Sequence, residues 1–158
     1  MPLAVCATPI GNLEDVTLRV LRELAEADLV LCEDTRRTRL LLERHRLSAR
    51  LVSYERHREA RRTAEILPLL EEGKRVALVS DAGLPGVNDP GARLITAAAE
   101  RGIPVIVLPG PSAVETALVA SGLVGERGRF SAERRGSCVG GAGLGIAEDG
   151  WVPHARSE

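Results

Sequence analysis

The sequence predicts an α/β fold in which a mainly parallel β-sheet carries helices on both faces. Apolar runs of strand length alternate with helical patterns over the first 122 residues, and this alternation is typical of βαβ units. The chain has 158 residues, of which 44% are hydrophobic, and that is enough to bury one core. Among the aromatic residues only Tyr54 precedes residue 122, so aliphatic side chains must build this core.

The first half of the pattern predicts two strands and two helices. A turn signal at 9–12 stops the first apolar run. Leu18 and Leu24 belong to a series of apolar residues at helical spacing, and leucines 40–42 are expected on the apolar side of the second helix. The predicted elements are, in order, a strand over 3–8, a helix over 18–25, a strand over 29–32 and a helix over 35–46.

The second half continues the alternation up to a break near residue 122. Gly73 follows an amphipathic stretch and is expected just after the end of a helix. The predicted elements are a weak strand over 51–53, a helix over 58–72, a strand over 75–79, a helix over 92–100, a strand over 104–108 and a helix over 113–120.

The last 36 residues differ in composition from the rest of the chain. From Gly122 onward the sequence loses its apolar periodicity and holds nine of its sixteen glycines. Such a segment loses much entropy on ordering and has little apolar surface to bury. We therefore predict a domain over 1–122 and a Gly-rich tail over 123–158 that is poorly ordered.

The net charge of the chain indicates no class of binding partner, but one stretch of the sequence is strongly basic. The chain holds 21 basic and 22 acidic residues, a formal charge of −1. Residues 36–62 nevertheless contain ten arginines against three acidic residues. Arginine is suited to phosphate contacts and base stacking, so this stretch indicates an RNA surface. The alternative is a solvated face in a protein that uses arginine instead of lysine, since Lys74 is the only lysine.

Several classes of protein are disfavoured by the sequence. No apolar run reaches the roughly 18 residues that cross a bilayer, and the N-terminus lacks the pattern of a signal peptide, so we expect a cytoplasmic protein without membrane contact. Cys6, Cys32 and Cys138 lack metal-ligand spacing, which favours buried thiols over a disulfide framework and predicts no metal. The P-loop and dinucleotide-binding glycine motifs are also missing after every predicted strand.

Three loops that follow apolar strands are rich in glycine and proline. They comprise residues 8–12, 80–91 and 108–112. Glycine allows close approach of a ligand to the backbone, and proline stiffens a loop. In parallel sheets ligands bind beyond the carboxyl ends of the strands. The loops therefore predict a preformed pocket, although glycine and proline serve ordinary turns as well.

Four ordered motifs resemble those of the 16S ribosomal RNA ribose methyltransferases within the tetrapyrrole methylase family. The motifs are ATPIGNLED at 7–15, CEDTR at 32–36, SDAGLPGVNDPG at 80–91 and PGPSA at 109–113. The resemblance covers residues 3–123. It implies methyl transfer from S-adenosylmethionine to the 2′-hydroxyl of a cytidine ribose in 16S rRNA of the small ribosomal subunit, by a homodimer.

The resemblance also implies which residues bind the cofactor. These are Pro9, Ile10 and Gly11 in the first loop, Asp81, Gly83, Leu84 and Val87 in the second, and Ser112 and Ala113 after the last strand. Main-chain carbonyls would face the positive charges of the cofactor, and apolar side chains would cover its adenine. Asp81 could instead cap its own turn.

Glu33 and Asp34 are the candidate catalytic residues. They follow the second strand, where a carboxylate could orient or deprotonate a ribose hydroxyl. Asp34 could instead cap the following helix. Arg36, Arg37 and Arg39 are the candidate RNA-binding residues, because arginines at this place could hold phosphates.

The chain departs from the resemblance in two ways. Leu84 and Asn88 stand where threonine and serine are common, and the sequence after Phe130 no longer follows the family. Family members continue with a second α/β domain, which we expect to be missing here. Because the family binds its cofactor between the two domains, the alternative function is an inactive N-terminal fragment that binds cofactor weakly. A methylase of the same superfamily acting on a tetrapyrrole is a third reading, which the CEDTR segment and the arginines disfavour.

Overall fold

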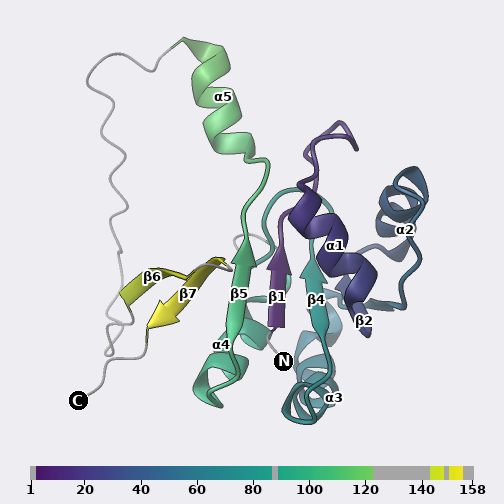
Figure 1. The fold of residues 1–158 in the computed structure, drawn as a ribbon, viewed down its shortest axis with the longest axis vertical. Helices are drawn as coiled ribbons and strands as arrows, with labels where there is room; N and C mark the ends of the chain where they lie inside the picture. Colours follow the sequence, from purple (N-terminus) through teal and green to yellow (C-terminus); the bar gives the residue numbers. More distant parts are fainter. Residues whose placement is uncertain (1–2, 87–88, 123–142, 148–149, 155–158) are drawn as a thin grey trace.

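Five parallel strands form the centre of the molecule. The computed structural model describes residues 3–86, 89–122, 143–147 and 150–154. The parallel strands pair in the spatial order β3-β2-β4-β1-β5, so that β1 lies between β4 and β5. All five strands run in one direction, and their carboxyl ends meet at one edge of the sheet (Figure 1). They are β1 (Leu3–Cys6), β2 (Leu29–Cys32), β3 (Leu51–Ser53), β4 (Val76–Val79) and β5 (Val105–Leu108).

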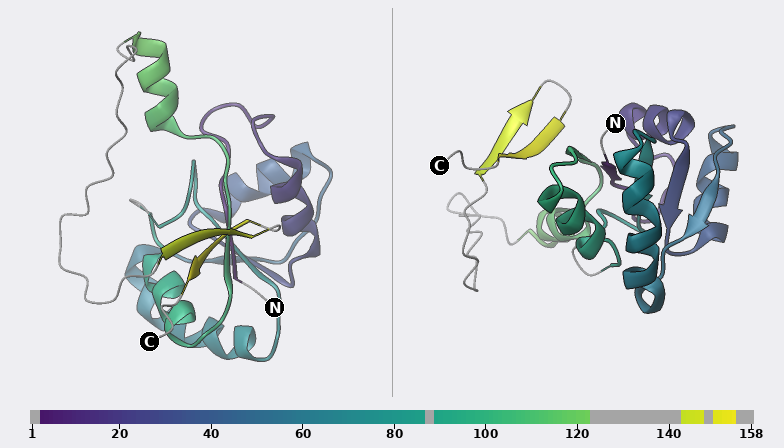
Figure 2. Two further views of the ribbon diagram at one scale, coloured as in Figure 1. Left: turned by 60° about the vertical axis from the view of Figure 1, so that its left-hand side comes forward. Right: turned by 90° about the horizontal axis from the view of Figure 1, so that it is seen from below.

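Helices cover both faces of this sheet (Figure 2). The helices α1 (Leu18–Glu26) and α2 (Thr35–Arg44) contribute to one hydrophobic cluster, and α3 (Glu59–Glu71) and α4 (Ala92–Glu100) to the other. A short 3-10 turn, Arg56–Arg58, leads into α3. Successive side chains of a strand point to opposite faces, and in β1 Leu3 and Val5 therefore join the α3–α4 cluster whereas Ala4 and Cys6 join the α1–α2 cluster.

The predicted α/β class and the order of its elements are confirmed. Every strand and helix predicted before residue 122 is present, with ends that differ by a few residues. The apolar side of α2 was predicted wrongly in one respect. Leu41 and Leu42 are buried, but Leu40 is 59% exposed, because three consecutive helical residues span about 200° and cannot all face the core. Leu18, at 79% exposed, likewise lies outside the core.

Two further parts of the chain follow the parallel strands. Helix α5 (Ala113–Ser121) extends beyond the carboxyl end of β5 (Figure 1), and none of its residues is buried. Strands β6 (Gly143–Ala147) and β7 (Gly150–His154) pair antiparallel, and β7 adjoins β5 with Trp151 opposite Val107. The rest of the predicted tail lies outside the described residues, and the division of the chain near residue 122 stays a prediction.

Two cysteines of the described part of the chain lie in the core. Cys6 and Cys32 are free and buried, as predicted for core thiols, and burial raises the pKa of both thiols. They are therefore protonated at neutral pH and poor nucleophiles. Cys138 lies outside the described residues.

Within the described part of the chain, every helix is too short or too polar to cross a membrane.

Candidate functional site

The loop after β1 is joined to the loop after β4. Thr8 and Gly83 form two backbone hydrogen bonds, in which the N–H of Thr8 donates to the carbonyl of Gly83 at 2.9 Å and the N–H of Gly83 donates back at 3.0 Å. The buried hydroxyl of Thr8 also donates to the carbonyl of Ser80 at 3.0 Å. These bonds hold the two loops in a fixed position relative to each other.

The loop after β5 packs against the same place. The N–H of Ala7 donates to the carbonyl of Leu108 at 3.1 Å. A Cβ atom at Gly110 would lie only 2.9 Å from the Cβ of Ala7, a distance below van der Waals contact, so this approach requires glycine. The three glycine- and proline-rich loops therefore meet at one edge of the sheet, as predicted.

A cavity of about 260 Å³ opens between the loop after β1, the loop after β4 and helix α2. Apolar side chains and hydroxyl groups form most of its wall, and one carboxylate and one guanidinium are included. The lining residues are Thr8, Pro9, Ile10, Gly11, Leu13, Arg37, Thr38, Leu40, Leu41, Ser80, Asp81 and Ala82. A volume near 260 Å³ lies below the roughly 300–1,000 Å³ of typical ligand pockets.

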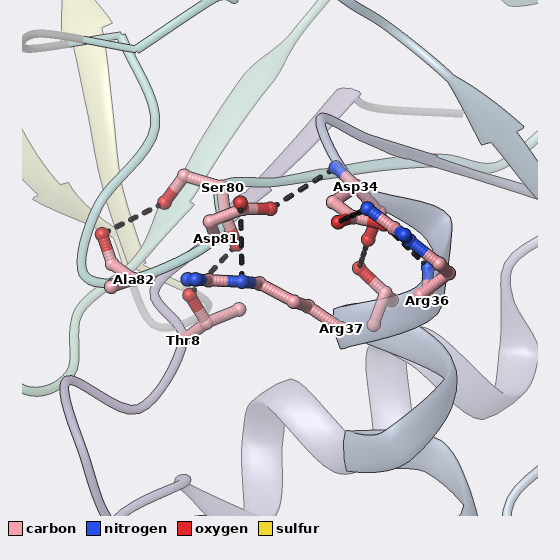
Figure 3. A network of polar contacts seen from close by, with 8 residues as sticks. Thr8, Asp34, Arg36, Arg37, Ser80, Asp81 and Ala82 are labelled. Atoms are coloured by element: carbon pink, nitrogen blue, oxygen red, sulfur yellow. Dashed lines mark hydrogen bonds and ion pairs between the residues drawn. The ribbon is translucent and has the colours of Figure 1, made fainter.

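Asp81 connects the loop after β4 to the start of α2 (Figure 3). Its Oδ1 atom accepts a hydrogen bond from the N–H of Asp34 at 3.1 Å, and its Oδ2 atom lies 3.6 Å from Nε of Arg37. The turn itself is closed by the hydroxyl of Ser80, which donates to the carbonyls of Ala82 and Gly83 at 3.1 Å each. The carboxylate of Asp81 therefore binds residues at the start of α2 and does not cap its own turn.

Asp34 is the N-cap of α2. Its Oδ1 atom accepts from the N–H of Arg36 at 2.8 Å, which satisfies one of the free N–H groups at the start of the helix. The guanidinium of Arg36 also contacts both carboxylate oxygens, at 3.1 and 2.8 Å. These hydrogen bonds to Arg36 lower the pKa of Asp34 to about 2. A carboxylate with so low a pKa is a weak proton acceptor.

We predict that Asp34→Asn lowers the melting temperature in a pH-dependent way. The folded pKa, about 2, lies below the unfolded value of about 3.9, so the carboxylate stabilises the protein fully above the unfolded pKa. This contribution is lost as the pH falls through the folded pKa. Thermal unfolding followed by circular dichroism should show a difference between wild type and variant at pH 7 that shrinks toward pH 2. Equal differences at both pH values would contradict the prediction.

Glu33 differs electrostatically from its neighbour. Partial burial raises the pKa of its carboxyl above the ordinary value, and the negative charges of Asp81 and Asp89 raise it further, against smaller opposing effects of Arg56 and Arg37. Two of these charged residues, Asp81 and Arg37, line the cavity. Two adjacent carboxyls with pKa values shifted in opposite directions are suited to different tasks.

The predicted cofactor-binding residues divide into two groups. Pro9, Ile10, Gly11 and Asp81 line the cavity. Gly83 lies where the loops meet, since a Cβ atom there would be 3.8 Å from Cγ2 of Ile10 and 4.0 Å from the carbonyl of Pro111. Leu84 packs partly buried against the α3–α4 cluster and Ser112 and Ala113 begin α5, so these three do not line the cavity. Val87 lies outside the described residues.

All three predicted RNA-binding arginines lie exposed on α2. Arg36 and Arg37 pair with Asp34 and Asp81, at 2.8 and 3.6 Å, and the arginine side chains are 89% and 65% exposed. Ion pairs this exposed are weak, so a phosphate can compete for them. Arg39 has no ion pair within the described residues and is not among the residues that line the cavity.

Sequence reasoning missed part of the cavity wall. Thr8, Ser80 and Thr38 are buried polar residues beside it, and Leu13 and Leu40 complete its apolar side. Thr8 and Ser80 lie in two of the motifs, each within two positions of a buried strand, which is a signal for them. Leu40 carried no such signal, because it was indistinguishable from its core-facing neighbours.

The loop after β1 is also tied to the far end of α2. The ring of His45 contacts the carbonyl of Leu13 through Nε2 at 2.9 Å, and Arg44 pairs with Glu14. Helix α2 therefore supports the cavity at both of its ends. Among the described residues, no group of three His, Cys, Asp or Glu side chains is placed to hold a metal.

Comparisons with known proteins agree with this architecture. Residues 2–132 match the family model described as Tetrapyrrole (Corrin/Porphyrin) Methylases. A protein named Ribosomal RNA small subunit methyltransferase I from Thermotoga maritima is 50% identical over 125 residues, which are 79% of this chain and 56% of that protein. The protein of the same name from Escherichia coli O157:H7 is 48% identical over 125 residues, 79% of this chain and 44% of that protein.

A solved structure also matches this chain over about half of its own length. The uroporphyrin-III-C-methyltransferase of Thermus thermophilus superposes with a TM-score of 0.59 at 30% identity, and the match covers 77% of this chain and 52% of that one. The chain thus spans about half the length of the relatives that it matches.

Proposed function

The chain belongs to the tetrapyrrole (corrin/porphyrin) methylase family, and from this we propose that it takes part in the transfer of a methyl group from S-adenosylmethionine to ribosomal RNA. The finer target we propose is the ribose 2′-hydroxyl of a cytidine in 16S rRNA. The names of the relatives support the class of substrate. The observation that carries the proposal is the convergence of three loops at the carboxyl ends of the strands, beside a cavity walled mostly by apolar side chains and hydroxyl groups.

The residues of this edge fit one portion of the cofactor. We propose that Pro9, Ile10, Gly11 and Gly83 hold it, with Asp81 as a charged wall residue and Leu84, Val87, Ser112 and Ala113 contributing where the ligand extends beyond the cavity. Apolar side chains such as Ile10 and Leu13 could cover an adenine, and the carboxylate of Asp81 favours a cation. When bound, the cofactor supplies a methyl group carried on a positively charged sulfur.

Glu33 is the proposed proton acceptor. A ribose hydroxyl is a weak nucleophile until its proton is removed, and a base with a pKa closer to neutrality is the more effective. The raised pKa of Glu33 supports this role, whereas the lowered pKa of Asp34 supports a positioning role through the N-cap of α2. Arg36, Arg37 and Arg39 would hold the phosphates beside the target nucleotide.

A second candidate function, weak cofactor binding without methyl transfer, is favoured by the size of the cavity. Its volume of about 260 Å³ is smaller than that of typical ligand pockets. Helix α5 further exposes Val114, Leu118 and Val119 at 63%, 41% and 72%, an apolar surface suited to cover by a second domain or by a second copy in a homodimer. The chain would then bind cofactor weakly and transfer no methyl group.

Calorimetry and a transfer assay together test both candidates. We expect S-adenosylmethionine to bind the 158-residue chain, and we expect radioactive methyl groups to appear on 30S subunits as 2′-O-methylcytidine. Gly110→Val tests whether binding depends on the site. A side chain at this position would push the loop after β5 away from Ala7, so binding should weaken. Binding without transfer would establish the fragment, and no binding at all would overturn both candidates.

The RNA contact gives a further prediction. Replacing Arg36, Arg37 and Arg39 together with alanine should weaken binding to 30S subunits and make it less dependent on salt. Each lost phosphate contact reduces the slope of log affinity against log salt by about 0.7–0.9, so the slope should fall by about 2. Electrophoretic mobility shifts between 50 and 200 mM salt measure it. Unchanged affinity in a variant that still binds cofactor would exclude these arginines.

A further inference from the structure

Strand β3 forms one edge of the sheet and lies between two hollows. A hollow of about 300 Å³ includes Leu51 in its lining, together with Arg39, Glu43 and Leu47. A second hollow of about 320 Å³ includes Val52. Leu51 and Val52 are successive residues of the strand, so their side chains point to opposite faces and the hollows flank the strand on its two sides. The second hollow also contains Arg50, Arg62 and Lys74.

Unpaired cations gather around this edge. Arg39, Arg46, Arg50 and Lys74 are exposed and form no ion pair within the described part of the chain. By contrast, Arg44 is paired with Glu14, and Arg61 and Arg62 share Glu65. We call the four unpaired residues the β3-edge cations.

The acidic residues of the second hollow are already engaged. The carboxylate of Asp28 accepts a hydrogen bond from the N–H of Arg75 at 2.8 Å. Glu65 accepts from two arginines, Arg61 and Arg62, at 2.8 Å each. Neither acid forms an ion pair with Arg50 or Lys74 within the described residues. With Glu43 of the first hollow included, the two linings hold four cations and three carboxylates. The balance of the two hollows is positive.

Arg46 occupies a backbone conformation that favours glycine. Its φ of 55° is the one positive value for a non-glycine residue among those described. The N–H of Arg46 donates to the carbonyl of Glu43 at 3.1 Å, and the N–H of Leu47 donates to the carbonyl of Leu42 at 2.8 Å. These two bonds define a Schellman motif after α2, in which glycine is the usual residue at this position. An arginine here places a cation next in sequence to Leu47, which lines the first hollow, at a cost in backbone strain.

We propose that three of the β3-edge cations, Arg46, Arg50 and Lys74, form a second RNA surface, which continues from Arg39 to backbone phosphates away from the target nucleotide. This inference rests on the proposed function. The surface begins near the site, because α2 carries Arg39 and its N-cap Asp34 follows the carboxyl end of β2. It ends at the amino ends of the strands, because Arg50 directly precedes β3 and Lys74 lies two residues before β4. Exposed arginines and lysines without an ion-pair partner attract the phosphates of a nucleic-acid backbone.

A structural role for the same charges makes different predictions. Proteins place charged residues on short edge strands to prevent pairing with other chains, and β3 has only three residues. In that case the charges would affect self-association but not the affinity for RNA. The dependence of RNA binding on salt separates the two roles.

The decisive variant combines Arg46→Gln, Arg50→Gln and Lys74→Gln. The control combines Arg22→Gln, Arg93→Gln and Arg101→Gln, which removes the same charge from three exposed cations on or next to α1 and α4. The full 158-residue chain is titrated into a 16S rRNA transcript between 50 and 200 mM potassium chloride. We expect the salt slope to fall by about 2–3 and the affinity at 100 mM to fall at least about tenfold in the decisive variant. The control should keep a slope close to that of the wild type.

Arg46→Gly gives an independent readout, because stability and affinity should move in opposite directions. Glycine relieves the positive φ, so the melting temperature should rise, while the loss of the cation should lower the affinity for RNA several-fold. A variant that is more stable and binds RNA unchanged would contradict the proposal for Arg46.

The outcomes also separate this inference from the proposed function. If the decisive variant binds like the control while the Arg36, Arg37 and Arg39 variant is weakened, the second surface is overturned and the proposed function stands. If the unaltered chain shows no salt-dependent binding to the transcript, the RNA part of the proposed function fails together with this inference. If the decisive variant and the control lose equal affinity, only net charge matters and the second surface is overturned.

Discussion

Replacing Glu33 with glutamine should lower the rate of methyl transfer to 30S subunits by about 10²–10⁴-fold, the usual contribution of a general base. Glutamine has nearly the same shape but cannot accept the proton of a ribose hydroxyl. The affinity for S-adenosylmethionine should change little, because Glu33 is not part of the cavity wall. Single-turnover transfer with a radioactive methyl donor, together with calorimetry, measures the two quantities separately.

Asp34→Asn is the matched control for this variant. Asparagine is a good N-cap, so α2 should keep its start, and the rate should fall far less than in Glu33→Gln. If Asp34→Asn lost as much activity as Glu33→Gln, the two carboxylates would have to act together. If Glu33→Gln kept full activity, the base would have to be sought elsewhere.

The dependence of the rate on pH gives a second test of Glu33. A base acts only when it is deprotonated, so the wild-type rate should decline as the pH falls through the pKa of Glu33. Burial and the charges of Asp81 and Asp89 raise that pKa, so the decline should begin at a higher pH than for an ordinary glutamate. In Glu33→Gln this decline should disappear. Asp34, with a pKa of about 2, would produce a decline only in strong acid.

Replacing Gly91 with alanine should have the largest effect on stability. Gly91 is the N-cap of α4 and has a φ of +137°, which side chains rarely adopt. A Cβ atom there would lie 2.8 Å from Cδ2 of Leu78, which is 1% exposed in the core and has little room to move. Backbone strain costs about 1–3 kcal/mol and overpacking a similar amount, so the free energy of unfolding should fall by about 3 kcal/mol.

Gly102→Ala is the control that isolates strain from steric overlap. Gly102 also has a positive φ, +69°, but no atom lies within 4 Å of a Cβ built on it. This variant should lose about 1 kcal/mol, the cost of a left-handed conformation alone. Unfolding in guanidinium chloride measures both variants. Equal losses would show that the core yields around Leu78.

Much of the fold could be predicted because its signals are local. Strands of a parallel sheet are buried on both faces and therefore appear as continuous apolar runs, as in 29–32 and 76–79. Helix α4 was predicted with its observed bounds, because Gly91 and Gly102 delimit its apolar pattern. Leu40 was misplaced because an uninterrupted run of leucines does not reveal which one faces away from the core.

Less of the candidate site could be predicted, because it depends on contacts between distant residues. The loops after β1, β4 and β5 were recognisable from their glycines and prolines, and they do meet. The bond between Asp34 and Asp81 spans 47 positions of the chain, and no sequence pattern indicates it. The assignment of the individual site residues stays a prediction that the variants above test.

By itself, the sequence determined the α/β class, the order of the elements and the three glycine- and proline-rich loops that follow β1, β4 and β5. These follow from hydrophobic periodicity and backbone preferences, which act over a few neighbouring residues. Only the tertiary structure decided which carboxylate caps α2, which has a raised pKa, and which arginines remain unpaired around β3. Electrostatic and hydrogen-bonding partners are chosen by distance in space, and folding brings together charges that lie far apart along the chain.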